Sequence, residues 1–176
     1  MLLCSGGCRS GKSEFARLRA EERGERRVFV ATAYVSDAEM RDRITKHRNA
    51  RGKGWIALEI ASGQWDEPET WVVEATGLGD VILFDCLTLW TSLCLERGLD
   101  ETGVLALTDR LLAALKGCGK PVVMVTNELG MGLVPENALA RQFRDVAGLV
   151  NQRAGCAADT LVFMVCGQPL YVKGRP

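Results

Sequence analysis

The sequence predicts a single α/β domain, residues 1–176, with a mostly parallel sheet covered by helices on both faces. Two observations carry this prediction. Short apolar runs that suit buried strands alternate along the chain with longer segments of helical periodicity. The 176 residues include no repeat, low-complexity stretch or dividing linker, and this length suits one domain with a substantial core.

The first strand and helix, expected at residues 1–4 and from Glu14 onward, enclose the segment GGCRSGKS. The segment has the phosphate-loop spacing of Gly, four residues, Gly-Lys-Ser. Glycines let successive backbone N–H groups face one phosphate, and the helix N-terminus adds its positive end. An ordinary glycine turn is the alternative, but strand and helix flank the loop as the motif requires. We therefore predict a nucleoside triphosphate site formed by Gly6, Gly7, Cys8, Arg9, Ser10, Gly11, Lys12 and Ser13.

Within this loop, Lys12 is the predicted catalytic cation for the outer phosphates, and the Ser13 hydroxyl is a predicted Mg²⁺ ligand. Cys8 is either a catalytic thiol or, more simply, a tolerated small residue.

The remaining elements follow in order from apolar periodicity and cap residues. Strands are expected at 28–32, 55–60, 81–85, 122–125 and 160–166, with a short edge strand near 171–172. Helices are expected from 36, from 66, at about 87–97, at 102–116 and from Pro135 onward, where one face would include Leu139.

Asp85 ends the apolar run VILFD, at the carboxyl end of a predicted central strand. An acid at this place in a nucleotide-binding sheet suits the metal ion that accompanies the phosphates. The alternative is an aspartate that caps the following helix.

His47 is the only histidine of the chain, and it shares a predicted helix face with Met40 and Ile44. Basic neighbours at 46, 48, 51 and 53 disfavour the imidazolium and attract phosphate, so a neutral ring there can attack phosphorus. The alternatives are a hydrogen-bonded core histidine and a solvated basic helix end.

Thr126, Asn127 and Glu128 end another central strand, before a glycine-rich loop. Polar residues at this sheet edge suit ligand binding, although a plain strand-to-helix loop has the same composition. The guanine-reading sequence N-K-x-D of switch GTPases is absent, since Glu128 follows Asn127.

Composition narrows the class of protein. Lys plus Arg and Asp plus Glu both number 22, so no basic field indicates nucleic acid as a partner. No apolar run is long enough to span a membrane, and the N-terminus lacks signal-peptide features, so a cytoplasmic location is expected. Seven cysteines without a C-x-x-C pair suit reduced, buried thiols rather than disulfides or zinc.

Four segments together resemble a known family: GGCRSGKS, AEMRDRITKHR, FDCLTLW and the long block VTNELGMGLVPENALARQFRDVAGLVNQRAGCAAD. They are similar to the bifunctional adenosylcobinamide kinase/adenosylcobinamide-phosphate guanylyltransferase of cobalamin biosynthesis, over nearly the whole chain. The resemblance implies a RecA-like P-loop NTPase fold and a homotrimer. It also implies phosphorylation of adenosylcobinamide by ATP or GTP, followed by GMP transfer from GTP to adenosylcobinamide phosphate.

The resemblance implies that His47 carries the GMP. Mg²⁺ is the expected cofactor, with Ser13 and Asp85 as its predicted ligands. The nucleotide contacts it implies beyond the loop are Ala31, Thr32, Ala33, Arg48, Asn49, Ala50, Arg51, Glu59 and Asp85. Two departures stand out, since the family usually has Ala at Cys8 and often Glu at Asp85. A kinase without the transferase step and a nucleotide-dependent switch remain as alternatives.

Overall fold

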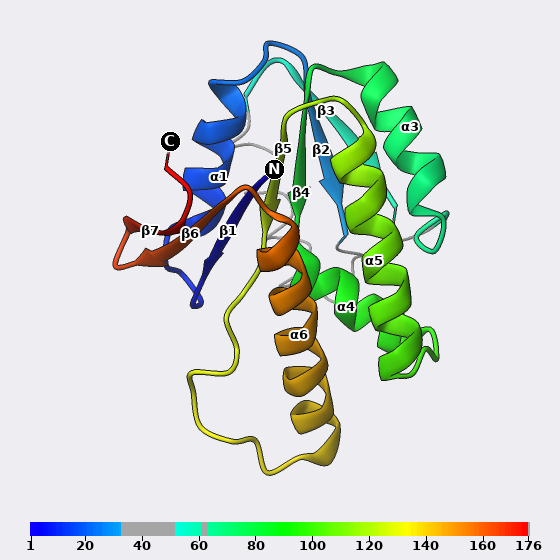
Figure 1. Cartoon of the computed structure of the whole chain (residues 1–176), viewed down its shortest axis with the longest axis vertical. Helices are drawn as coiled ribbons and strands as arrows, with labels where there is room; N and C mark the ends of the chain where they lie inside the picture. Colours follow the sequence, from blue (N-terminus) through cyan, green and yellow to red (C-terminus); the bar gives the residue numbers. More distant parts are fainter. Residues whose placement is uncertain (33–51, 61–62, 176) are drawn as a thin grey trace.

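The computed structural model describes residues 1–32, 52–60 and 63–175, and its elements form one twisted sheet with helices on both sides (Figure 1). Within these residues the sheet has seven strands in the order β3-β2-β4-β5-β1-β6-β7. The strands are β1 (Leu2–Gly6), β2 (Arg27–Ala31), β3 (Trp55–Glu59), β4 (Val81–Asp85), β5 (Val122–Val125), β6 (Thr160–Val165) and β7 (Gln168–Lys173). All neighbouring strands pair in parallel except β7, which runs antiparallel to β6 at the edge.

The helices divide between the two faces of the sheet (Figure 1). They are α1 (Lys12–Glu21), α3 (Pro68–Leu78), α4 (Leu87–Glu96), α5 (Glu101–Gly117) and α6 (Ala138–Ala157). Alternate strand residues bury their side chains on opposite faces. Leu3 and Phe84 pack with α3, α4, α5 and α6, whereas Leu2 and Leu83 pack with α1. The predicted α/β class with both faces covered is therefore confirmed.

Helix α6 differs from its prediction at its start. It begins at Ala138 rather than near Pro135, because the Asn137 side chain caps it by accepting a hydrogen bond from the Ala140 N–H at 3.1 Å. Leu139, expected on the buried face, is 68% exposed. The first turns of α6 extend beyond the sheet together with the β5–α6 loop, so none of the described strands covers them (Figure 1).

The thiols are all free, but the prediction that they are buried holds only in part. Cys4, Cys86 and Cys94 are buried, whereas Cys156 and Cys166 are exposed. Cys166 has a positive φ of 49° and starts the turn between β6 and β7, which is why the strand expected to reach it ends at Val165.

The helix expected from residue 36, which includes His47, lies outside the described residues. Among the described helices, none combines the length and the apolar character that a membrane crossing requires.

Candidate nucleotide-binding site

The phosphate loop turns sharply between the end of β1 and the start of α1. Gly6, Arg9 and Gly11 have φ values of 157°, 55° and 92°. A Cβ on Gly6 would lie 2.6 Å from the Ser10 Oγ and 2.9 Å from the Met164 carbonyl oxygen, so this position requires glycine. The result is a tight backbone loop that leads directly into the N-terminus of α1, an arrangement suited to binding an anion.

Lys12 is the first residue of α1 and is only 8% exposed. Its Nζ donates a hydrogen bond to the Gly7 carbonyl oxygen at 3.1 Å. A buried ammonium requires such compensation. The lysine is therefore folded back over its own loop, which places its charge beside the backbone that would surround a phosphate.

The turn between β6 and β7 supports the loop from behind, a contact that the sequence analysis missed. The Gly167 N–H donates to the Ser10 carbonyl oxygen at 3.1 Å. A Cβ on Gly11 would lie 3.4 Å from the Gly167 Cα, so the two backbones approach closely. Gly167 between two strand-like runs was the available signal, since glycine is favoured in tight hairpin turns.

Three predicted nucleotide contacts lie in one row across the sheet. The strand register aligns Ala31 of β2 with Glu59 of β3 on one side and with Asp85 of β4 on the other. Asp85 is half-buried and Glu59 is exposed. Because parallel strands end at a common edge, these residues lie along the same edge as the phosphate loop.

The charges of Asp85 and of Lys12 in the phosphate loop both affect the pKa of the Cys86 thiol. The pKa of the Cys86 thiol is raised to about 12, mainly by burial and also by the Asp85 charge, while the Lys12 charge opposes this rise. Asp85 and Lys12 thus both act on one buried side chain, which indicates that the β4 acid and the loop lysine share one part of the molecule.

Thr32, a predicted nucleotide contact, uses its side chain inside the protein. Its Oγ1 donates to the Cys86 carbonyl oxygen at 3.0 Å and accepts from the Cys86 N–H at 2.8 Å. This pair of bonds joins the end of β2 to the turn that follows Asp85. The Thr32 hydroxyl therefore positions that turn, and any nucleotide contact at this residue remains a prediction.

The other predicted site residues fall outside the described residues: His47, Ala33, Arg48, Asn49, Ala50 and Arg51. Thr32, the residue that precedes this stretch, lies at the carboxyl end of β2, on the edge that carries the phosphate loop.

The donor atoms at this edge fit a magnesium ion bound together with a nucleotide. Ser13 offers a hydroxyl and Asp85 a carboxylate, and hard oxygen ligands of this kind suit Mg²⁺. Within residues 1–32, 52–60 and 63–175, no group of three or more His, Cys, Asp or Glu side chains could hold a metal ion. In nucleotide sites generally, Mg²⁺ keeps several waters and binds the substrate phosphates through one or two protein ligands.

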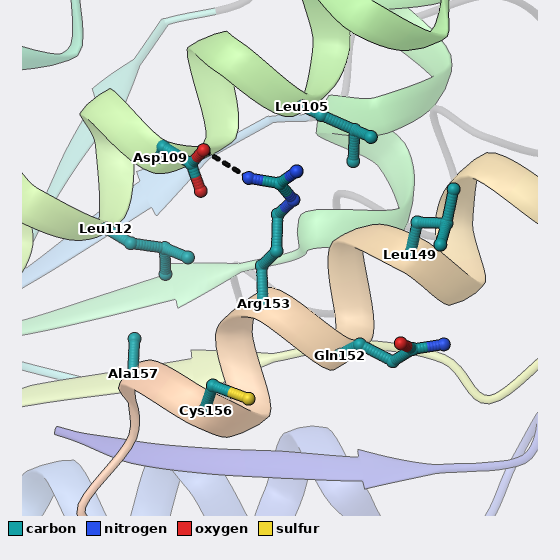
Figure 2. Close-up of a pocket in the computed structure, with 8 residues that line it drawn as sticks. All are labelled: Leu105, Asp109, Leu112, Leu149, Gln152, Arg153, Cys156 and Ala157. Atoms are coloured by element: carbon teal, nitrogen blue, oxygen red, sulfur yellow. Dashed lines mark hydrogen bonds and ion pairs between the residues drawn. The ribbon is translucent and has the colours of Figure 1, made fainter.

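A separate cavity of about 620 Å³ lies between α5 and α6, in the helical layer on the opposite side of the sheet from α1 (Figure 2). Its wall is largely apolar and includes Leu105, Leu112 and Leu149. Asp109 and Arg153 form an ion pair across it (Figure 2). The lining contains none of the predicted nucleotide contacts, so this cavity is distinct from the phosphate-loop site.

Together, the sheet order, the phosphate loop and the acid at the end of β4 define a P-loop nucleotide-binding protein. A comparison of structures agrees. The KaiC-like protein PH0186 from Pyrococcus horikoshii OT3 superimposes with a TM-score of 0.57 at 14% identity, covering 99% of this chain and 78% of that one. At this identity the likeness shows the fold alone, an α/β P-loop NTPase of the RecA type.

Sequence comparison is more specific. Residues 2–172 match the family model described as cobinamide kinase / cobinamide phosphate guanyltransferase, and the chain belongs to this family. The chain is 35% identical to the bifunctional adenosylcobalamin biosynthesis protein CobU of Salmonella typhimurium, covering 98% of this chain and 99% of the relative. It is 36% identical to the protein CobP of Pseudomonas aeruginosa that carries the same bifunctional description, covering 99% and 98%.

Proposed function

We propose that this chain is a bifunctional enzyme of adenosylcobalamin biosynthesis. It first phosphorylates a hydroxyl of adenosylcobinamide with ATP or GTP, and then transfers GMP from GTP to that phosphate. The products of the second step are adenosylcobinamide-GDP and pyrophosphate. The observation that carries the proposal is a formed phosphate loop with a buried lysine, at one sheet edge with Asp85, in a chain of this family.

In the kinase step the substrate hydroxyl oxygen bonds to the γ-phosphorus as the bond from that phosphorus to the β-phosphate oxygen breaks. The hydroxyl proton passes to water as this bond forms. The loop N–H groups and Lys12 hold the nucleotide oxygens and stabilise their charge. Mg²⁺, held by the Ser13 hydroxyl and the Asp85 carboxylate, would supply further positive charge when bound. Positioning of the two reacting groups contributes most of the remaining acceleration.

In the transferase step a ring nitrogen of His47 bonds to the α-phosphorus of GTP, and the bond to the β-phosphate oxygen breaks. Pyrophosphate leaves, and GMP stays on the histidine. An oxygen of the substrate phosphate then attacks the same phosphorus and releases the histidine. Splitting the transfer in this way replaces one difficult displacement with two easier ones. The nucleotide contacts proposed for this step include Ala31, Glu59 and the 48–51 segment.

We also propose that the protein is a cytoplasmic homotrimer. Four large apolar side chains near the start of α6 support a contact between subunits, since they are exposed in the single chain: Met131, Leu133, Val134 and Leu139. Light scattering coupled to size-exclusion chromatography would measure the assembly. A mass of one chain at micromolar concentration would contradict this part of the proposal.

The activities are tested by incubating the protein with adenosylcobinamide, GTP and Mg²⁺ and separating the corrinoid products by chromatography. We expect the phosphate first and the GDP derivative later. Lys12→Ala should abolish both products, whereas His47→Ala should accumulate the phosphate alone. Loss of both activities in His47→Ala would instead assign the histidine a structural role. A wild-type protein that makes only the phosphate would be a simple kinase, and one that only hydrolyses GTP slowly would be a switch.

A further inference from the structure

The segment after β5 lies between the phosphate loop and Asp85, the two parts of the predicted nucleotide site. In the sheet, β5 is flanked by β1, which enters the phosphate loop, and by β4, which ends at Asp85 (Figure 1). The chain stays paired with β1 beyond the end of β5, because the Glu128 N–H donates to the Gly6 carbonyl oxygen at 3.0 Å. Asn127, the residue before Glu128, is therefore held next to the first residue of the phosphate loop.

A closed ring of hydrogen bonds holds the Asn127 backbone. The Asn127 N–H donates to the Thr88 Oγ1 at 2.8 Å, and the Thr88 and Thr126 hydroxyl oxygens are 3.3 Å apart. The Thr126 hydroxyl donates to the Asn151 Oδ1 at 2.6 Å, and the Asn151 Nδ2 donates to the Asn127 carbonyl oxygen at 2.9 Å. The ring thus joins the end of β5, α4 and α6 around one residue, Asn127.

The direction of every bond in this ring follows from the chemistry of its members. The single proton of the Thr126 hydroxyl goes to Asn151, so Thr88 must donate to Thr126. Each hydroxyl then donates once and accepts once. Both threonines are buried, and each hydroxyl has its donor and its acceptor within the ring, so the ring is complete without water. A fully satisfied buried network of this kind is rigid.

The Asn127 side chain, in contrast, has no partner in this network. Its Oδ1 is buried and makes no hydrogen bond within the described part of the chain. A half-turn of the amide exchanges Oδ1 and Nδ2, so the group can either donate or accept. An unpaired buried amide oxygen is destabilising, and on a rigid backbone beside a binding loop it is expected where a ligand provides the missing partner, once the amide has turned to present its donor.

The ligand group is identified by its chemistry. The phosphate loop presents backbone N–H groups and Lys12, all of them donors, which select an anion rich in acceptor oxygens. The inner phosphates are expected over the loop and the N-terminus of α1. The end of β5 lies between the strand that enters the loop and the strand that ends at Asp85, and we expect the outermost phosphate there.

We propose that the Asn127 carboxamide donates a hydrogen bond to the terminal phosphate of the bound nucleoside triphosphate. Thr88, Thr126 and Asn151 are positioning residues that hold Asn127 for this contact. The inference rests on the nucleotide site described under the proposed function and adds a residue that distinguishes a triphosphate from a diphosphate. No bond at Asn127 forms or breaks during phosphoryl transfer.

The test compares the affinities of wild type, Asn127→Ala and Asn127→Asp for GDP and for a GTP analogue with a β,γ-imido bridge. Hydrogen bonds to charged groups are strong enough that Asn127→Ala should bind the analogue about tenfold more weakly or worse. Its affinity for GDP should stay within about twofold, since GDP lacks the contacted phosphate. Asn127→Asp keeps the shape but repels phosphate, so its loss should be larger. Equal losses for both nucleotides, or no loss, would overturn the proposal.

Asn137→Ala is the matched control, because it removes another asparagine amide that caps α6 and does not belong to the ring. It should lower the melting temperature while leaving the ratio of the two affinities at the wild-type value. Thr126→Val should open the ring and reduce the ratio partly, and Thr126→Ser should restore it. A merely structural role would lower stability without changing the ratio. If wild type itself binds no GTP analogue, the nucleotide site fails; if wild type binds it and Asn127→Ala keeps the wild-type ratio, only this inference fails.

Discussion

Thr32→Val removes one hydroxyl from the end of β2 and leaves the size and branching of the side chain nearly unchanged. Thr32 is 1% exposed, and its Oγ1 makes both hydrogen bonds to Cys86 described above. The Cys86 carbonyl oxygen would keep a second partner, because it also accepts from the Trp90 N–H at 3.1 Å. The Cys86 N–H would lose its partner in a buried environment.

The cost follows from these two losses. A buried donor left unpaired costs about 1–3 kcal/mol, and the other lost bond, whose acceptor keeps a partner, costs about 0.5–1.5 kcal/mol. We therefore expect the free energy of unfolding to fall by about 2–4 kcal/mol. For a domain of this length each kcal/mol corresponds to about 2–4 °C, so the melting temperature should fall by about 4–16 °C.

Urea denaturation at one fixed protein concentration measures this change. Thr32→Ser is the control, since it keeps the hydroxyl and loses only a methyl group, worth about 1 kcal/mol. The turn after Asp85 should also be less well positioned in the valine variant, so kinase turnover should fall. If the valine variant unfolds within about 0.5 kcal/mol of wild type, or if serine costs as much as valine, the Thr32 hydroxyl does not make the stated contribution to stability.

Three further outcomes test other parts of the structure. Asp100→Ala should lower the free energy of unfolding by about 1 kcal/mol, because the Asp100 side chain caps α5 by accepting from the backbone at 2.8 Å; calorimetry measures this change. A thiol reagent should label the exposed Cys8 in the native protein, and bound GTP should protect this thiol. Cys86 should react only after unfolding, because burial raises the pKa of its thiol to about 12. Mass spectrometry of peptides distinguishes the two cysteines. Hydrogen bonds from arginine side chains hold the pKa values of Glu69 and Asp80 below their ordinary values. The two carboxylates therefore contribute fully to stability when the pH is above their ordinary pKa values, and this contribution is lost as the pH falls below about 4. Urea midpoints measured against pH should show a small loss, because both carboxylates are exposed.

The local elements were largely predictable because they depend on short-range signals. The apolar runs at 81–85 and 122–125 coincide with β4 and β5, since a buried parallel strand needs little besides continuous apolar residues. The phosphate loop was recognisable because its chemistry needs fixed spacing. The start of α6 was misplaced because proline and asparagine cues compete, and the Asn137 cap determined the outcome.

The contacts that complete the site were not predictable, because they depend on strand order and register. Thr88 and Asn127 are separated by 39 positions and meet only because β4 and β5 are neighbours. The sequence marked Asn127 as a polar residue at a strand end but contained no signal for its partner Asn151 on α6. The contact between Gly167 and the phosphate loop likewise exists only because β6 lies beside β1.

The proposed function requires the protein to carry GMP on His47 between its two substrates. Intact-protein mass spectrometry after incubation with GTP and Mg²⁺, without any corrinoid, tests it most directly. We expect a mass increase of one GMP that is lost in acid and is absent in His47→Ala. A folded protein that binds GTP but shows no such increase would contradict the covalent mechanism.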